Sequence, residues 1–190
     1  MSRIIAGSVG SLRLSAPAKT TRPTADRVKE SLFSALESAS VIEGSKVLDL
    51  FAGTAALGLE AISRGARSLT SVEKARAAAE VCRKNIEAVA AALQKQKLSA
   101  QIQLIEQDCE SFLKKNKELF DLVLIDPPYD LQPAKLAAIF SELKKSLSPD
   151  ALVVLEKSSR ASEPEFAGYE IHNRKQYGDT EVLFIRASAQ

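Results

Sequence analysis

Five short apolar runs alternate with segments of helical periodicity, and this alternation restricts the possible folds more than any other feature of the chain. The runs lie at residues 46–50, 69–73, 102–106, 121–125 and 151–156, and the segments between them predict helices at 56–64, 75–97, 110–115 and 133–147. Strands that alternate with helices form a parallel sheet covered on both faces. Because parallel crossovers are right-handed, we expect a doubly wound sheet of the α/β class.

Both ends of the chain depart from this alternation. At the N-terminal end, residues 3–14 are rich in apolar residues and are broken by two glycines, which predicts a small β-hairpin. Near the C-terminus, residues 170–175 and 181–186 flank a Tyr-Gly-Asp turn and predict an antiparallel hairpin. We expect one domain over residues 1–190, made of a hairpin arm at 1–20 and a core at 21–190.

The composition is typical of a soluble globular protein of about one domain. The chain has 190 residues, of which 45% are hydrophobic and 26% are charged. No apolar run approaches the roughly 20 residues needed to cross a bilayer, and no secretory signal is apparent. Cys82 and Cys109 lie far apart without the spacing of metal ligands, which favours free thiols and a reducing compartment. We therefore expect a cytoplasmic monomer with no membrane partner and no metal.

Positive charge is concentrated in the first 30 residues. Six basic side chains stand there against two acidic ones, although the whole chain carries a net charge of only +2. A basic arm on a nearly neutral body suits contact with nucleic-acid phosphates, although an ordinary solvated segment has the same composition. The candidate contacts are Arg3, Arg13, Arg22 and Arg27.

A glycine-containing loop joins the first strand of the alternating pattern to the helix after it. In a doubly wound sheet such a loop lies at the carboxyl end of the strand, where ligands bind, and glycine allows a ligand to approach the backbone. The G-x-A-x-x-G pattern also fits a dinucleotide-binding loop, and a turn without a ligand would contain similar residues. The candidate cofactor contacts of this loop are Asp49, Phe51, Ala52, Gly53, Thr54, Ala55 and Gly58.

Acidic residues near this loop indicate what the ligand is. The carboxylate of Asp49 would repel a pyrophosphate but attract the ammonium of an amino-acid moiety, which favours S-adenosylmethionine over NAD. Glu73 ends the next strand, 20 residues after Gly53, and is placed to bind ribose hydroxyls, with Lys74 beside it. After the third strand, Asp108 and the backbone of Cys109 are placed to meet the adenine ring. A carboxylate that only caps the following helix would occupy the same position.

The sequence Asp126-Pro127-Pro128-Tyr129 follows directly on the fourth strand and is the most specific segment of the chain. Two prolines fix the backbone and remove two N–H donors. The exocyclic amine of a base is a poor nucleophile, because its lone pair is delocalised into the ring. Hydrogen bonds from this amine to Asp126 and the Pro127 carbonyl would draw the nitrogen toward tetrahedral geometry, while Tyr129 stacks on the base. The alternative is a proline pair that merely ends a strand.

Together these residues resemble the class I amino-methyltransferases of nucleic acids, through Asp49-x-Phe51-Ala52-Gly53 and Asp126-Pro127-Pro128-Tyr129. More narrowly, the chain resembles the RsmD family, the 16S rRNA (guanine(966)-N(2))-methyltransferases. The stretches that carry this likeness are Arg3-Ile4-Ile5-x-Gly7, Arg22-Pro23-Thr24-x-Asp26-Arg27-Val28-x-Glu30-x-Leu32-Phe33, Leu57-Gly58-Leu59-Glu60-Ala61, Ser63-Arg64-Gly65-Ala66 and Lys175-x-Tyr177-Gly178.

The resemblance implies a Rossmann-like class I methyltransferase fold with a seven-stranded, mostly parallel sheet. It implies S-adenosylmethionine as methyl donor, S-adenosylhomocysteine as product, and a guanine N2 of 16S rRNA as acceptor, within the small ribosomal subunit or its assembly intermediate. The chain departs from the family pattern at Ala55, where a glycine is usual. It also departs at Gly10 and Leu12, where the N-terminal hairpin usually carries bases.

Three other functions fit parts of the pattern. A DNA adenine-N6 or cytosine-N4 methyltransferase would use the same Asp-Pro-Pro-Tyr loop, but the short chain shows no obvious target-recognition domain. A nicotinamide-dependent oxidoreductase would use the glycine loop, but Asp49 and Ala55 oppose it. A non-catalytic RNA-binding module on the same fold is opposed by the intact loop at 126–129.

Overall fold

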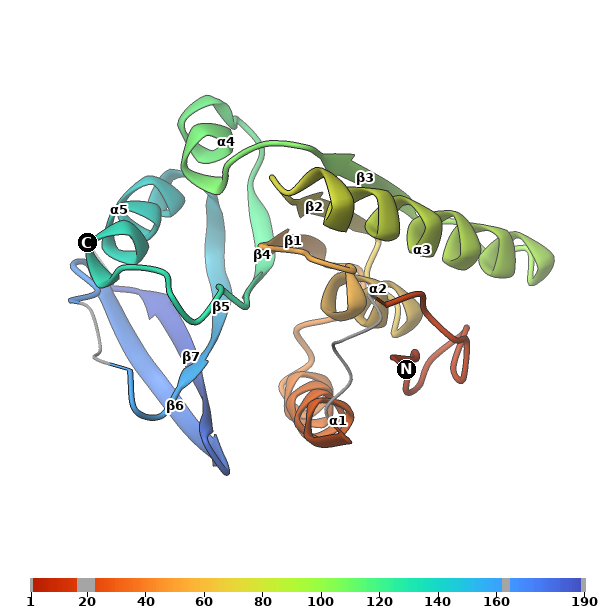
Figure 1. Ribbon diagram of the computed structural model, residues 1–190, viewed down its shortest axis with the longest axis horizontal. Helices are drawn as coiled ribbons and strands as arrows, with labels where there is room; N and C mark the ends of the chain where they lie inside the picture. Colours follow the sequence, from red (N-terminus) through yellow and green to blue (C-terminus); the bar gives the residue numbers. More distant parts are fainter. Residues whose placement is uncertain (1, 17–22, 162–164, 189–190) are drawn as a thin grey trace.

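A seven-stranded sheet organises the part of the chain that the computed structural model describes, residues 2–16, 23–161 and 165–188 (Figure 1). The strands are β1 (Lys46–Leu50), β2 (Ser68–Val72), β3 (Gln101–Ile105), β4 (Phe120–Ile125), β5 (Leu147–Ser158), β6 (Tyr169–Tyr177) and β7 (Thr180–Ala187). The helices are α1 (Pro23–Ser38), α2 (Ala56–Ser63), α3 (Arg76–Lys95), α4 (Cys109–Lys115) and α5 (Pro133–Leu143), with a 3-10 turn, η1 (Lys144–Ser146), after α5. Of the helices in these ranges, none combines the length and apolarity needed to cross a bilayer.

The strand order places β1 and β4 side by side at the centre of the sheet. The order is β3-β2-β1-β4-β5-β7-β6, with β1 to β5 parallel and β7 antiparallel to both β5 and β6. This confirms a mostly parallel sheet with an antiparallel C-terminal hairpin. The direction of winding reverses between β1 and β4, and open α/β sheets bind ligands beyond the carboxyl ends of the strands at such a point. The loops after β1 and β4 therefore mark the expected site.

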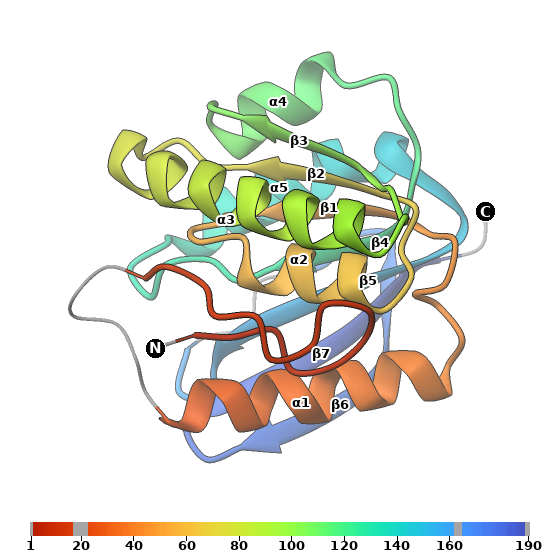
Figure 2. The same ribbon diagram turned by 90° about the vertical axis from the view of Figure 1, so that its right-hand side faces the viewer.

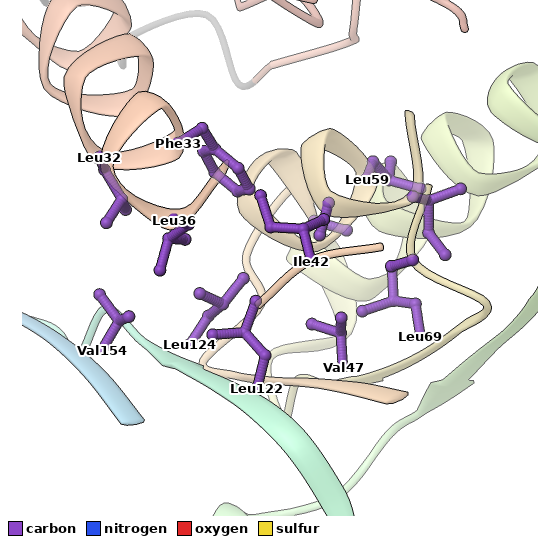
Figure 3. Packing of buried hydrophobic residues seen from close by; sticks show 14 of the residues in the cluster. Leu32, Phe33, Leu36, Ile42, Val47, Leu59, Leu69, Leu122, Leu124 and Val154 are labelled. Carbon is purple, nitrogen blue, oxygen red and sulfur yellow. The ribbon is translucent and has the colours of Figure 1, made fainter. Parts of the chain in front are cut away.

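Helices cover both faces of the sheet. Helices α1, α2 and α3 pack on one face, and α4 and α5 pack on the other (Figure 2). On the first face, Leu32 and Leu36 of α1 point toward Leu124 of β4 and Val154 of β5 (Figure 3). Because β4 is buried on both sides, four consecutive residues at its end are apolar, as expected for a central parallel strand.

The N-terminal β-hairpin expected over residues 3–14 is not formed, and the prediction was wrong in this respect. The segment folds back on itself, but one isolated antiparallel bridge, between Arg3 and Arg13, takes the place of two strands. The next amides bond to helix α2 instead, because Ile5 and Ala6 donate to the carboxylate of Glu60 at 2.7 and 3.1 Å. Because these two amides donate to the carboxylate, they cannot also donate to the backbone carbonyls of a paired strand.

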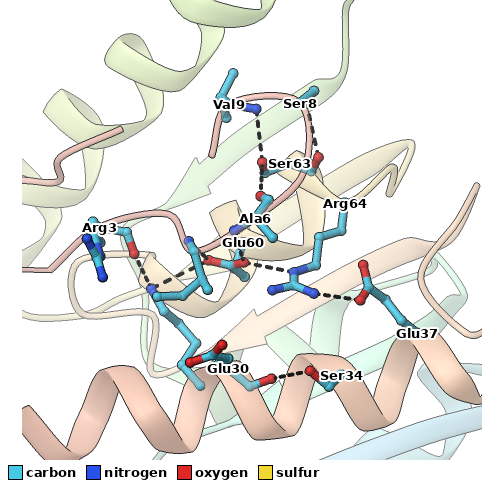
Figure 4. A network of polar contacts seen from close by, with 12 residues as sticks. Arg3, Ala6, Ser8, Val9, Glu30, Ser34, Glu37, Glu60, Ser63 and Arg64 are labelled. Carbon is cyan, nitrogen blue, oxygen red and sulfur yellow. Dashed lines mark hydrogen bonds and ion pairs between the residues drawn. The ribbon is translucent and has the colours of Figure 1, made fainter. Parts of the chain in front are cut away.

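Buried polar side chains of α2 hold residues 2–16, the described part of the N-terminal arm, in place (Figure 4). Ser63 donates to one backbone carbonyl of the arm at 2.6 Å and accepts from one backbone amide at 3.1 Å. The fully buried carboxylate of Glu60 is balanced by Arg64 Nε at 2.8 Å and Lys29 Nζ at 3.6 Å. A Cβ added to Gly7, which has a φ of 85°, would lie 2.0 Å from the Ser63 carbonyl oxygen. The arm is therefore fixed to α2, the helix that follows the loop after β1.

Candidate active site

The loop between β1 and α2 has a backbone shape that few residue types adopt. Phe51, Gly53 and Ala55 all have positive φ angles, of 61°, 55° and 59°. A Cβ added to Gly53 would meet nothing nearer than the Phe51 carbonyl oxygen at 3.9 Å, so the space above this glycine is open to a ligand. Ala55 is fully buried and holds the left-handed conformation that the usual glycine adopts without strain. Ala55 therefore occupies a position whose backbone conformation favours glycine.

Asp49 lies under this loop with almost no contact with solvent. Its side chain is 2% exposed, and Oδ2 accepts the Gly58 amide at 3.1 Å. A Cβ at Gly58 would lie 2.5 Å from a Leu69 methyl and 2.9 Å from Asp49 Oδ2, so Gly58 serves the packing of α2. Burial raises the pKa of Asp49 to about 7; the Gly58 hydrogen bond opposes this rise, and the charges of Asp126 and Glu73 add to it.

Glu73 lies beside the loop between β1 and α2 and also holds the backbone of that loop by a hydrogen bond. Its Oε2 accepts the Gly53 amide at 2.9 Å and its Oε1 accepts the Ala75 amide at 2.7 Å. Each carboxylate oxygen has a second lone pair, so hydrogen bonds from ribose hydroxyls remain possible. Lys74 is exposed beside it. The contacts of Glu73 and Lys74 with a cofactor stay predictions.

The charges at these strand ends fit a cationic ligand. The charges of Asp126 and Glu73 both act on Asp49, and no lysine or arginine of the described chain forms an ion pair with any of these three carboxylates. A buried carboxylate without a counter-ion is costly, and a ligand that carries positive charge would relieve that cost. The ammonium and sulfonium of S-adenosylmethionine meet this requirement, whereas a pyrophosphate would be repelled.

Asp108 caps helix α4. Its Oδ1 accepts the amides of Glu110 and Ser111 at 3.1 and 3.4 Å, and its Oδ2 lies 3.1 Å from Lys135 Nζ. Burial acts to raise the pKa of Asp108, but these partners outweigh it and the pKa is lowered. The structure thus shows Asp108 as the cap of α4, and its contact with an adenine amine stays a prediction.

The buried Cys109 has its thiol pKa raised to about 12 by desolvation, so this thiol is inert.

The loop at 126–129 opens into a cavity of about 250 Å³. The Leu131 amide donates to the Pro128 carbonyl at 2.9 Å and closes the turn, which leaves Tyr129 77% exposed at the rim. Solvent reaches Asp126, yet the protein around its carboxyl group raises its pKa to about 6 by desolvation. The cavity is lined by Asp126, Pro127, Pro128, Tyr129, Asp130, Leu131, Gln132, Pro133, Leu136, Glu156, Lys157, Ser158, Ala161 and Thr180.

Sequence reasoning missed two residues of this region. Glu156 of β5 borders the same cavity as Asp126, and its position at the end of an apolar run was the available signal. The buried Asn85 of α3 donates to the Thr54 carbonyl at 2.9 Å and to the Ser15 carbonyl at 3.0 Å. It therefore links the loop between β1 and α2 to the N-terminal arm, and no local sequence pattern marks it.

The described arginines among the candidate RNA contacts are not part of this cavity lining. Arg3 and Arg13 are exposed and joined by the bridge of the N-terminal arm, and Arg27 is exposed on α1. Arg22 lies outside the described residues. Among the residues that are described, no cluster of three or more His, Cys, Asp or Glu side chains could hold a metal ion.

Sequence comparison finds relatives along nearly the whole chain. The profile of the family described as conserved hypothetical protein 95 matches residues 2–186. The Bacillus subtilis protein named "Putative rRNA methyltransferase YlbH" is 33% identical over 97% of this chain and 98% of its own. The Escherichia coli protein named "Ribosomal RNA small subunit methyltransferase D" is 31% identical over 99% of this chain and 91% of its own.

Solved structures share the architecture. The Escherichia coli protein named "Putative methyltransferase yhhF" has a TM-score of 0.81 at 30% identity, over 100% of this chain and 99% of its own. The magnesium protoporphyrin IX methyltransferase of Synechocystis, solved with bound SAM, has a TM-score of 0.65 at 14% identity, over 87% of this chain and 80% of its own. At that identity the likeness concerns the fold alone.

Proposed function

This chain belongs to the family described as conserved hypothetical protein 95, and from that premise we propose that it methylates the N2 amine of a guanine in 16S rRNA of the small ribosomal subunit. Its membership and its relatives make it an S-adenosylmethionine-dependent methyltransferase of the RsmD type. What we propose is the identity of the methyl acceptor: guanine as the base, its N2 as the amine, and 16S rRNA as the RNA. One observation carries it: the Asp-Pro-Pro-Tyr loop opens into a cavity and follows β4, the strand next to β1, where the buried Asp49 feels the charge of Asp126 and suits a cationic donor.

The residues of the first loop would hold the donor. When bound, S-adenosylmethionine supplies a methyl group on a positively charged sulfur, and the carbon–sulfur bond breaks as the nitrogen–carbon bond forms. Asp49 contributes negative charge below the loop, and Glu73 fixes the Gly53 amide and offers its free lone pairs to ribose hydroxyls. The open space above Gly53 lets the ligand approach the backbone.

The second loop would hold the acceptor. Asp126 and the Pro127 carbonyl accept hydrogen bonds from the amine, which localises the lone pair on the nitrogen. A carboxylate with a pKa of about 6 is too weak a base to deprotonate a neutral aromatic amine. Once methylated, the nitrogen is cationic and strongly acidic, so it gives a proton to Asp126, which releases it to the solvent that reaches the group.

The N-terminal arm would contact the RNA. Arg3 and Arg13 are held next to each other by the bridge between them, and Glu60 and Ser63 of α2 fix the arm. Two exposed guanidinium groups on an anchored segment suit the backbone phosphates of a structured RNA. Arg27 on α1 extends the same basic region of the sequence.

Substitution of Asp126 tests the proposed chemistry. Asp126→Ala removes the acceptor and should abolish single-turnover methyl transfer to unmodified small subunits, while S-adenosylmethionine still binds in calorimetry. Asp126→Asn keeps an acceptor oxygen in nearly the same place, so a reduced but measurable rate is expected. Wild-type rates for the alanine variant would contradict the mechanism, and loss of donor binding in both variants would move Asp126 to the cofactor site.

A further inference from the structure

The cavity beside Asp126 contains a second carboxylate, on the neighbouring strand. In the parallel pairing of β4 with β5, Ile125 lies opposite Leu155. Asp126 follows Ile125 directly after the end of β4, Glu156 follows Leu155 within β5, and both border the cavity. Because neighbouring strands lie about 5 Å apart, the two carboxylates enter the cavity from adjacent positions.

Glu156 has no protein partner for its charge. It makes no hydrogen bond or ion pair with any residue in the described ranges. The nearest basic neighbour in the strand, Lys157, is paired with Glu181 at 2.9 Å. Burial, and then the charge of Asp126, raise the pKa of Glu156 to about 7, and no cation opposes this rise. An acceptor with this much desolvation and no donor fits a ligand that brings the donor.

The bases differ in whether the ring nitrogen next to the exocyclic amine is a hydrogen-bond donor or an acceptor. The Watson–Crick edge of guanine presents an N1–H donor next to the N2 amine. Adenine and cytosine present a ring nitrogen acceptor next to their exocyclic amines, and an ionised carboxylate opposite that acceptor would be repelled. A carboxylate beside the one that holds the amine is therefore complementary to guanine, and such matched pairs are a main source of discrimination between bases.

We infer that Glu156 selects guanine by accepting its N1–H, while Asp126 accepts from the N2 amine. This inference rests on the proposed function, because it assumes that an exocyclic base amine enters the cavity at Asp126. It assigns the choice of base to β5, outside the Asp-Pro-Pro-Tyr loop. Asp126 then activates whichever amine is presented, and Glu156 determines which base presents it.

The base analogue 2-aminopurine tests this division of roles. It keeps the N2 amine but has a ring nitrogen acceptor in place of N1–H. The substrate is a small subunit reconstituted with either guanine or 2-aminopurine at the nucleotide that the wild-type protein methylates. A glutamine side chain has an N–H₂ donor, so Glu156→Gln can pair with the analogue. The assay is run at about pH 8.5, above the Glu156 pKa of about 7, so that the wild-type side chain is an ionised carboxylate with no proton to donate to the analogue. The measured quantity is the ratio of kcat/KM for guanine to kcat/KM for 2-aminopurine.

We expect the wild-type protein to prefer guanine by roughly 10- to 100-fold, the effect of one hydrogen bond to a charged group. Glu156→Gln should lower this ratio at least about tenfold and raise the rate with 2-aminopurine. Glu156→Ala should also lower the ratio, because kcat/KM for guanine falls while kcat/KM for 2-aminopurine does not change. The matched control Glu170→Gln changes an exposed glutamate of β6 and should keep the wild-type ratio. Calorimetric affinity for S-adenosylhomocysteine shows that each variant is folded.

Two results would overturn the inference, and they differ. If folded Glu156→Gln and Glu156→Ala both keep the wild-type ratio while guanine is methylated normally, Glu156 does not read the base and the proposed function stands. If the wild-type protein methylates no guanine in the subunit, the proposed function fails and the inference fails with it.

Discussion

Replacement of Asp49 by asparagine should stabilise the ligand-free protein at neutral pH and weaken its affinity for the methyl donor. Asp49 is buried, and the Gly58 amide at 3.1 Å is its hydrogen-bond partner. Asparagine keeps an oxygen that can accept this bond but carries no charge to desolvate. The site therefore loses a charge that destabilises the fold and that would attract a cationic ligand.

The size and the pH dependence of the effect follow from the pKa of Asp49. Its pKa in the folded protein is about 7, above the ordinary value of 3.8. Between these values the folded state holds a proton that the unfolded state has lost, so this group lowers stability as pH rises from about 4 to about 7 and then has a constant effect. At 1.36 kcal/mol per pKa unit, the upper bound is about 4 kcal/mol. Because a buried amide has its own desolvation cost, we expect a gain of about 1–3 kcal/mol at pH 8.

Denaturant unfolding at several pH values measures this gain. The advantage of Asp49→Asn over the wild-type protein should be small near pH 4, grow up to pH 7 and stay level at pH 8. At about 2–4 °C per kcal/mol, the melting temperature should rise by several degrees at pH 8. Calorimetry should show weaker binding of S-adenosylmethionine. A variant that is less stable than the wild-type protein at pH 8, or an advantage that does not change with pH, would refute the reasoning.

Three further predictions concern the loop, the arm and its anchor. Glu73→Ala should weaken S-adenosylhomocysteine binding by roughly 10- to 100-fold, because it removes a charged acceptor at the loop; an unchanged calorimetric Kd would remove Glu73 from the site. Charge reversal at Arg3 and Arg13 should raise the KM for small subunits and flatten its salt dependence without changing donor affinity; an unchanged salt slope would exclude the arm as the phosphate contact. Gly7→Ala should lower the unfolding free energy by about 1–3 kcal/mol, because its Cβ would clash with the Ser63 carbonyl; wild-type stability in urea would show that the arm is not anchored there.

The alternating core was predictable because its signals are local. Each central strand is a buried apolar run and each helix has its own periodicity, so their places follow from neighbouring residues. The end of α5 shows the limit. Helical periodicity extends to residue 147, but the helix stops at Leu143 because Leu147 pairs with Phe120 of β4. A partner far away in the sequence decides this boundary.

In the candidate site, too, the residues with a local signal were predictable and those that depend on distant partners were not. The loop at 126–129 was recognisable because its composition is unusual in itself. Glu156 was not, because its proximity to Asp126 depends on β5 lying next to β4, which is a property of the sheet order. The hairpin prediction failed for a related reason, since Glu60 competes for amides more than 50 residues away in the chain. Asp108 could be placed at a helix start, but its partner Lys135 could not be foreseen.

Mapping of the modified nucleotide tests the central claim most directly. Unmodified small subunits are incubated with the protein and S-adenosylmethionine carrying an isotopically labelled methyl group, and the labelled nucleoside is identified and located. We expect N2-methylguanine at a single position of 16S rRNA, and no label when Asp126→Ala is used. Label on an adenine N6 or a cytosine N4, or no label in the subunit under conditions where the donor binds, would contradict it.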